Sequence, residues 1–145
     1  GGPNGHLPFR TADGGYDPVA GMQNKDSAAK PEVYKPEDIS ENPTLAQMAV
    51  TALDVLKSRS DKIWMLLEAG DVDWANHQNN LDASIGAVIS GDDAFKATVD
   101  WIEKNVGWDD AVVLLTADHG HYLVLDDPTA LLAPKKPKES STEAK

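Results

Sequence analysis

The chain of 145 residues contains no cysteine, so disulfide bridges and thiolate-based zinc sites are both excluded. Basic residues are few: 13 lysines and arginines stand against 24 aspartates and glutamates, which leaves a formal net charge of −11. A surface of that sign cannot neutralise a phosphate backbone, so we expect no nucleic acid among the partners. No uninterrupted apolar run reaches 18 residues, so the sequence predicts no membrane span.

The start of the chain lacks an initiator methionine and the charged and apolar regions of a signal peptide, and we therefore expect a piece of a longer protein. Residues 1–43 hold six of the nine prolines and few apolar residues, a composition typical of an extended loop or connector. Lysine, proline, serine, threonine and glutamate dominate residues 133–145, which predicts a disordered tail. Residues 44–132 remain as the folded portion.

A first helix is predicted to begin with Asn42 as its N-cap and Pro43 in the first helical position, and to end near Ser58. Its apolar residues recur at helical spacing and are expected to form the buried face: Leu45, Met48, Ala49, Ala52 and Leu56. Helical spacing returns over residues 81–102. There the sequence leaves two alternatives, two helices divided near Gly91 or one long helix that Gly91 weakens.

Two short apolar runs predict buried strands over residues 62–67 and 111–116, and a third short strand is predicted over 122–125. Helices that alternate with strands are typical of an α/β fold with a parallel sheet. We expect Trp64, Trp101 and Trp108 in the core. Because two or three strands leave open sheet edges and an incomplete core, the isolated chain is predicted to be only marginally stable.

Polar clusters follow both of the main predicted strands, at the position where α/β folds place their chemistry. The first cluster contains Glu68, Asp73 and His77, and the second contains Asp118, His119 and His121. Carboxylate oxygens and neutral imidazole nitrogens are ligands that suit zinc and similar divalent ions. The competing interpretation is ordinary solvated carboxylates and bystander histidines in a strongly acidic chain.

Spacing within each cluster limits which side chains can share an ion. If residues 73–77 form a helical turn, Asp73 and His77 lie on one face and can bind one ion, while Glu68 reaches a second. Asp118 and His119 are neighbours in the chain, so their side chains diverge. They can bind one ion together only if the backbone turns sharply. Gly120 permits such a turn.

In order and in context, the two clusters resemble the C-terminal half of the alkaline phosphatase family. The residues that carry the resemblance are Glu68, Asp73 and His77, followed by Thr116-Ala117-Asp118-His119, and the similarity covers roughly residues 5–128. The resemblance, to a bacterial member, implies a partial three-layer α/β fold with a mostly parallel sheet flanked by helices.

The resemblance also implies a ligand set for two zinc ions and one magnesium ion. Glu68 would hold the magnesium, Asp73 and His77 the first zinc, and Asp118 and His119 the second zinc. His121 is a candidate for a further ligand or for support behind the ligands, and Trp74 is a candidate for the substrate pocket. For the full-length protein the resemblance implies hydrolysis of phosphomonoesters in the periplasm or outside the cell, and it makes a homodimer possible.

The chain departs from the family pattern at the nucleophile. In the family this is a serine in an Asp-Ser-Ala motif far upstream of the glutamate. Asp26-Ser27-Ala28 copies those letters, but Ser27 precedes Glu68 by only 41 residues, and Pro31 disfavours a helix there. We interpret Ser27 as a chance match. The phosphate-binding arginine is also missing, since neither Arg10 nor Arg59 lies in a matching context.

Without these groups the isolated chain is expected to be inactive, and the catalytic residue stays unknown. Two further hypotheses remain open. One is a non-catalytic metal-binding fragment or pseudoenzyme. The other is a sulfatase, phosphodiesterase or phosphomutase of the same superfamily.

Overall fold

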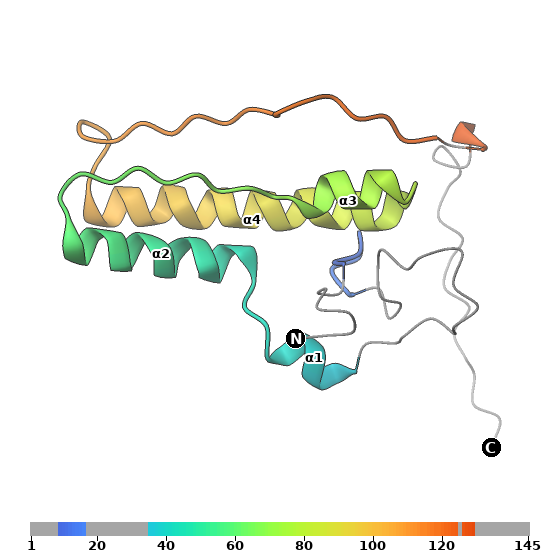
Figure 1. Ribbon diagram of the computed structural model, residues 1–145, viewed down its shortest axis with the longest axis horizontal. Coiled ribbons are helices and arrows are strands. Elements are labelled where there is room, and N and C mark those ends of the chain that lie inside the picture. The colour runs from blue at the N-terminus through green and yellow to red at the C-terminus, as the bar shows by residue number, and fades with distance from the viewer. Residues whose placement is uncertain (1–8, 17–34, 125, 130–145) are drawn as a thin grey trace, which may run out of the picture.

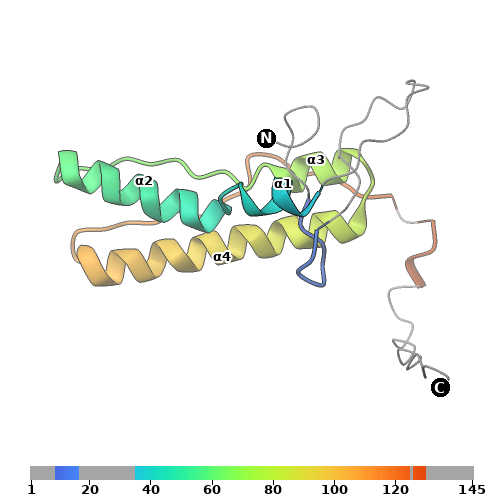
Figure 2. The ribbon, with the colours of Figure 1, turned by 90° about the horizontal axis from the view of Figure 1, so that it is seen from below.

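The computed structural model describes residues 9–16, 35–124 and 126–129 (Figure 1). Within these ranges it contains the helices α1 (Pro36–Ser40), α2 (Leu45–Arg59), α3 (Asp71–His77) and α4 (Leu81–Asn105). Helix α4 is the longest, and α2 lies along its C-terminal half while α3 lies along its N-terminal half (Figures 1 and 2). None of these helices combines the length and the apolar character needed to span a bilayer.

Helix α2 begins two residues later than the sequence predicts. The Thr44 hydroxyl accepts a hydrogen bond from the Gln47 backbone N–H at 3.2 Å, and the Gln47 side chain accepts one from the Thr44 N–H at 2.9 Å. This reciprocal pair is a capping box, which satisfies two backbone donors at once. The predicted N-cap, Asn42, is therefore wrong, because Thr44 is the residue that can pair with Gln47.

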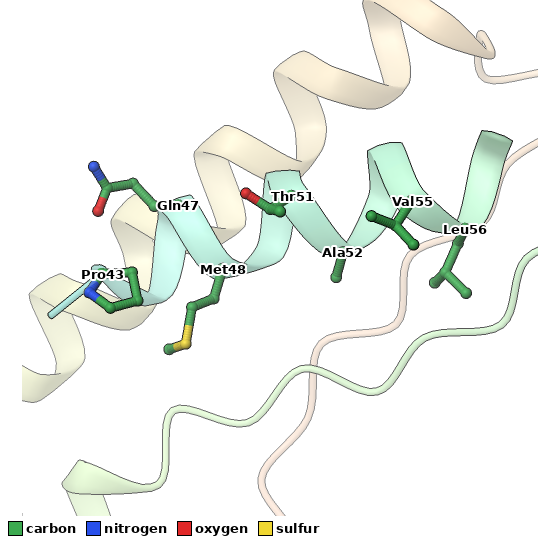
Figure 3. A pocket seen from close by; sticks show the side chains of 7 residues that line it. All are labelled: Pro43, Gln47, Met48, Thr51, Ala52, Val55 and Leu56. Atoms are coloured by element: carbon green, nitrogen blue, oxygen red, sulfur yellow. The ribbon is translucent and has the colours of Figure 1, made fainter. Parts of the chain in front are cut away.

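The face of α2 that is buried differs in part from the predicted one. Ala49 and Leu53 are buried, whereas Met48 is 44% exposed. Leu53 packs against Trp101 and Ile102 of α4. On another face of α2 a shallow apolar hollow is open to solvent (Figure 3), lined by Pro43, Gln47, Met48, Thr51, Ala52, Val55 and Leu56. Helix α2 thus carries two apolar faces, and spacing alone does not say which of them α4 covers.

Helix α4 is one continuous helix of 25 residues, so the alternative of two helices divided near Gly91 is wrong. Its N-cap is Asn80, whose side chain accepts a hydrogen bond from the Ala83 N–H at 3.0 Å. At Gly91 an added Cβ atom would lie 3.0 Å from the Cβ atom of Ala69. The glycine therefore permits the chain before α3 to approach α4 closely.

The predicted α/β fold, with its mostly parallel sheet, is wrong for the described residues. They contain no β-strand, and their only bridge is an isolated antiparallel one between Arg10 and Tyr16. The two main predicted strands, residues 62–67 and 111–116, are non-helical segments that run in the same direction along α4 (Figure 1). Residues 122–124 are not a strand either, and residue 125 lies outside the described residues. A strand requires a backbone partner, and these segments contact the helices through side chains instead.

Side chains in the two segments alternate between the helices and solvent. Those that pack against the cluster of Leu53, Trp101 and Ile102 are Ile63, Met65, Ala111 and Val113. Their neighbours are more than 80% exposed: Trp64, Leu66, Val112 and Leu114. A period of two is the period of a strand with one covered face. Of the tryptophans expected in the core, Trp101 is buried, whereas Trp64 and Trp108 are exposed.

Part of the predicted connector packs against the helices. Phe9 is 5% exposed and lies in a small core with Ala75 of α3 and Ala83 of α4. The segment 9–16 crosses α4 (Figure 2), and at Gly86 an added Cβ atom would stand 1.9 Å from the Arg10 carbonyl oxygen. This contact joins the start of the chain to the N-terminal half of α4. The predicted tail over residues 133–145 lies outside the described residues.

Candidate metal centre

Helix α3 carries Asp73 and His77 of the first cluster, whereas Glu68 precedes the helix. Asp73 and His77 are one turn apart, and His77 Nε2 lies 3.4 Å from Asp73 Oδ2. Ala75, midway between them in sequence, is fully buried against Phe9 and Ala83. Because side chains two residues apart point to roughly opposite sides of a helix, burial of Ala75 turns Asp73 and His77 away from that small core.

The second cluster approaches the same aspartate. The Nε2 atoms of His119 and His121 lie 3.7 Å and 3.8 Å from Asp73 Oδ1. The rings of His77 and His121 are 4.6 Å apart, edge to face, with an interplanar angle of 87°. Asp73 is therefore the residue at which the two clusters meet.

Hydrogen bonds to backbone carbonyls define which imidazole nitrogen carries the proton. His119 Nδ1 lies 3.2 Å from the Gly120 oxygen, and His121 Nδ1 lies 2.9 Å from the Tyr122 oxygen. A carbonyl oxygen only accepts, so each Nδ1 must be the donor. In the neutral ring the lone pair is then on Nε2, the atom that faces Asp73. Metal-binding histidines are commonly oriented by such a second hydrogen bond.

The hydrogen bond to the Gly120 carbonyl, and to a smaller extent the negative charge of Asp118, raise the pKa of His119 above its usual value. The charge of Asp73 raises this pKa further. A metal ion must compete with that proton for Nε2. The raised pKa of His119 therefore shifts metal binding at its Nε2 toward higher pH.

The arrangement fits a divalent cation in two respects. Among the described residues Asp73 Oδ1 is buried and accepts no hydrogen bond, and the Nε2 atoms of His119 and His121 face it at 3.7 Å and 3.8 Å, so a cation held by these groups would give the oxygen a direct partner. Ligand atoms of a tetrahedral zinc site stand about 3.3 Å apart when the bonds are about 2.0–2.1 Å long. The Asp73–His77 pair, at 3.4 Å, and the Asp118–His119 pair, at 3.3 Å, both match this spacing.

The sequence-predicted residues do not all converge. Asp73, His77 and His121 offer ligand atoms that lie within 4.8 Å of one another. Asp118 contacts His119, but its side chain is 82% exposed. Glu68 is exposed and is not part of the Asp73 group in the described residues. Trp74 is 45% exposed, and its ring lies 6.4 Å from that of His77.

The sequence alone leaves the role of His121 undecided and assigns no role to Phe9. The spacing of His119 and His121 was a usable signal, because side chains two apart in an extended segment share a side. Phe9 carried no such signal, because nothing near it in the sequence indicates that it would pack under α3.

Comparison with known proteins identifies the family. The alkaline phosphatase family model matches residues 18–136, well over half of the chain. The chain belongs to the alkaline phosphatase family. The resemblance inferred from the two clusters is thereby confirmed, and the family together with the Asp73 group suggests metal dependence.

Relatives in the family include proteins of bacteria and of an insect. Alkaline phosphatase 4 of Bacillus subtilis is 30% identical over 55% of this chain, and the match covers 17% of that protein. Membrane-bound alkaline phosphatase of Bombyx mori is 31% identical over 59% of this chain and 15% of its own length. Alkaline phosphatase of Escherichia fergusonii is 28% identical over 81% of this chain and 24% of its own length. The chain thus spans less than a quarter of these relatives. No solved structure matches it significantly.

Proposed function

We propose that this chain is the metal-binding portion of a phosphomonoesterase that acts as part of a longer alkaline phosphatase. The observation that carries the proposal is the convergence on Asp73. Its buried Oδ1 accepts no hydrogen bond from the part of the chain that the structure describes, while the Nε2 atoms of His119 and His121 face it at 3.7 Å and 3.8 Å. Family membership supports the same function, since the family's name is that of a phosphatase.

The proposed ligand set has two zinc sites and one magnesium site. Asp73 and His77 hold the first zinc, with His121 as their third ligand, because these three lie within mutual reach. Asp118 and His119 hold the second zinc, and Asp118 Oδ2 lies 3.3 Å from His119 Nε2. Glu68 holds magnesium, a role that follows from the resemblance. Bound zinc would stabilise negative charge on the phosphoryl oxygens and on the attacking and leaving oxygens.

The chain's own residues contribute orientation and charge. The carbonyls of Gly120 and Tyr122 keep the Nδ1 atoms of His119 and His121 protonated and aim both Nε2 atoms at Asp73. Asp73 Oδ2 lies near His77 Nε2, and Asp73 Oδ1 lies near the Nε2 atoms of His119 and His121, so its carboxylate would supply negative charge to both proposed ligand groups. Trp74, exposed beside His77, supplies an apolar wall for the organic part of a phosphomonoester.

We propose that the nucleophile is supplied by a part of the longer protein outside this chain. Ser27 lies outside the described residues and remains a chance match in our interpretation. We therefore expect little or no turnover by the isolated chain. The second candidate function, a non-catalytic metal-binding fragment or pseudoenzyme, is favoured by this same missing serine. A sulfatase or phosphodiesterase has less support, because the matched family is that of the alkaline phosphatases.

For the longer protein we propose phosphomonoesters as substrates, a periplasmic or secreted location and a homodimer. These follow from the family resemblance.

The test is metal analysis of the purified chain after loading with zinc. Wild type is expected to retain stoichiometric zinc, and both Asp73→Ala and His119→Ala are expected to retain less. Asp100→Ala is the matched control, since it removes an exposed carboxylate on α4 instead. Wild-type protein that holds no zinc at micromolar concentrations contradicts the proposal. Ser27→Ala should leave zinc content and any residual phosphatase activity unchanged.

A further inference from the structure

The turn between α3 and α4 contains a residue that contacts the second cluster. Asn79 has φ of +55°, the one positive value among the described non-glycine residues. Its side chain donates a hydrogen bond from Nδ2 to the Val124 carbonyl oxygen at 2.6 Å, and its Oδ1 accepts one from the Val124 N–H at 2.6 Å. A side-chain amide that pairs in both directions with one backbone residue acts as a strand neighbour would.

This pairing joins two segments that are 45 residues apart in the chain. Asn79 comes two residues after His77, and Val124 comes three residues after His121. The link therefore lies just beyond both histidines whose rings meet at 4.6 Å. Residues 117–122 are classed as exposed, and although the His121 side chain is only 21% exposed, little other burial holds that segment in place.

We propose that Asn79 is a positioning residue that holds His121 against Asp73 and His77 and so preorganises the three for a metal ion. The inference rests on the proposed function, in which these residues bind zinc. Asparagine suits the position for two reasons. It tolerates positive φ better than most residues, and it carries both a donor and an acceptor. Supporting hydrogen bonds behind metal ligands typically change affinity by about 10–100-fold when they are lost.

The experiment compares wild type, Asn79→Gly and Asn80→Ala. Glycine keeps the backbone conformation at position 79 but removes the amide. Asn80→Ala is the matched control, because it removes the side-chain cap of α4 at the next residue and leaves the Val124 pairing intact. Far-UV circular dichroism establishes that all three proteins keep their helices. Zinc affinity is measured by competition with a chromophoric chelator, and Co²⁺ absorption reports the ligand geometry.

Asn79→Gly is expected to bind zinc about tenfold or more weakly than wild type and to alter the Co²⁺ spectrum, whereas Asn80→Ala should match wild type in both. In the absence of metal, the nuclear Overhauser effect between the His77 and His121 rings is measured as well. Wild type and Asn80→Ala should show it, and Asn79→Gly should lose it.

Zinc affinity within twofold of wild type in Asn79→Gly, with the ring contact retained, overturns the proposal. Equal loss in Asn79→Gly and Asn80→Ala also overturns it, because the effect would then be general destabilisation. If wild type binds no zinc, the proposed function fails by itself. The ring contact then decides the positioning role, since its persistence in Asn79→Gly rejects that role and its loss supports it.

Discussion

Asp73 Oδ1 on α3 and His121 Nε2 in the segment after α4 lie 3.8 Å apart, although 48 residues separate them in the chain. Helix α4 accounts for this proximity. It carries the chain away from α3 over 25 residues, and the extended segment 111–116 returns along it (Figure 1). The end of segment 111–116 therefore lies near the start of α4, and this brings the second cluster back to the first.

His121→Ala tests whether this meeting matters for metal binding. The substitution removes one of three ligand atoms that lie within 4.8 Å of one another, so zinc affinity should fall by about 100-fold or more, at or above the loss caused by removing a supporting residue. His6→Ala is the control, because it removes an imidazole outside both clusters. Isothermal titration with zinc measures both. An affinity for His121→Ala equal to wild type would show that His121 is not a ligand.

Leu53→Ala and Met48→Ala compare the two apolar faces of α2. Leu53 is 5% exposed against Trp101 and Ile102, whereas Met48 is 44% exposed at the open hollow. Loss of a buried leucine costs about 2–5 kcal/mol, a large share of the free energy of unfolding of a typical domain, so Leu53→Ala should unfold at a clearly lower urea concentration than wild type. Met48→Ala should change the free energy of unfolding by no more than about 0.5 kcal/mol. Urea unfolding followed by circular dichroism distinguishes them, and equal effects would contradict the assignment of faces.

Asp54→Ala tests the polar contact between α2 and α4. The Trp101 indole N–H donates a hydrogen bond to Asp54 Oδ1 at 2.7 Å, beside the cluster that contains Leu53. Removing the acceptor should lower the free energy of unfolding by about 1 kcal/mol. Asp54→Asn keeps an oxygen acceptor and should retain most of the stability. If thermal unfolding shows Asn and Ala to be equally destabilising, the hydrogen bond is not the cause.

Gly86→Ala tests the crossing of α4 by the start of the chain. The added methyl group would stand 1.9 Å from the Arg10 carbonyl oxygen, so the segment must move away. That movement should break the ion pair of 2.6 Å between Arg10 and Asp93 and expose Phe9. We expect a net loss of about 1–3 kcal/mol, despite alanine's better helix propensity.

Gly91→Ala is the comparison for this crossing. Its new methyl group would meet only the Cβ atom of Ala69, at 3.0 Å, so the loss should be smaller. Trypsin cleavage at Arg10 reports the displaced segment directly. Cleavage as slow in Gly86→Ala as in wild type would show that the crossing is not maintained in solution.

Much of the local structure was predictable from spacing. Apolar periodicity predicted α2 and the helix over residues 81–102, and the placement of Asp73 and His77 one turn apart follows from any helix over residues 73–77. The cap of α2 was misplaced by two residues, because Asn42-Pro43 is a strong start signal in isolation. Only the reciprocal hydrogen bonds of Thr44 and Gln47 decide between the two starts.

The predicted parallel sheet is the largest difference between the sequence-based prediction and the structure. Ile63 and Met65 point to the helices while Trp64 and Leu66 face solvent, so the alternation that predicts a strand is present in the structure. Alternation reports a covered face, and it does not report a hydrogen-bonded neighbour. Pairing depends on which other segment lies beside it, and in the described residues no segment pairs with 62–67.

The amino-acid sequence by itself determined the helical spacing, the absence of thiolate chemistry and the two clusters whose order identifies the family, because these depend on residue type and on neighbours within a turn or two. Tertiary structure decided that His121 faces Asp73, that Phe9 packs under α3 and that Asn79 pairs with Val124. Each of these contacts joins residues more than 40 positions apart, and such contacts depend on how α4 and the segments beside it pack together.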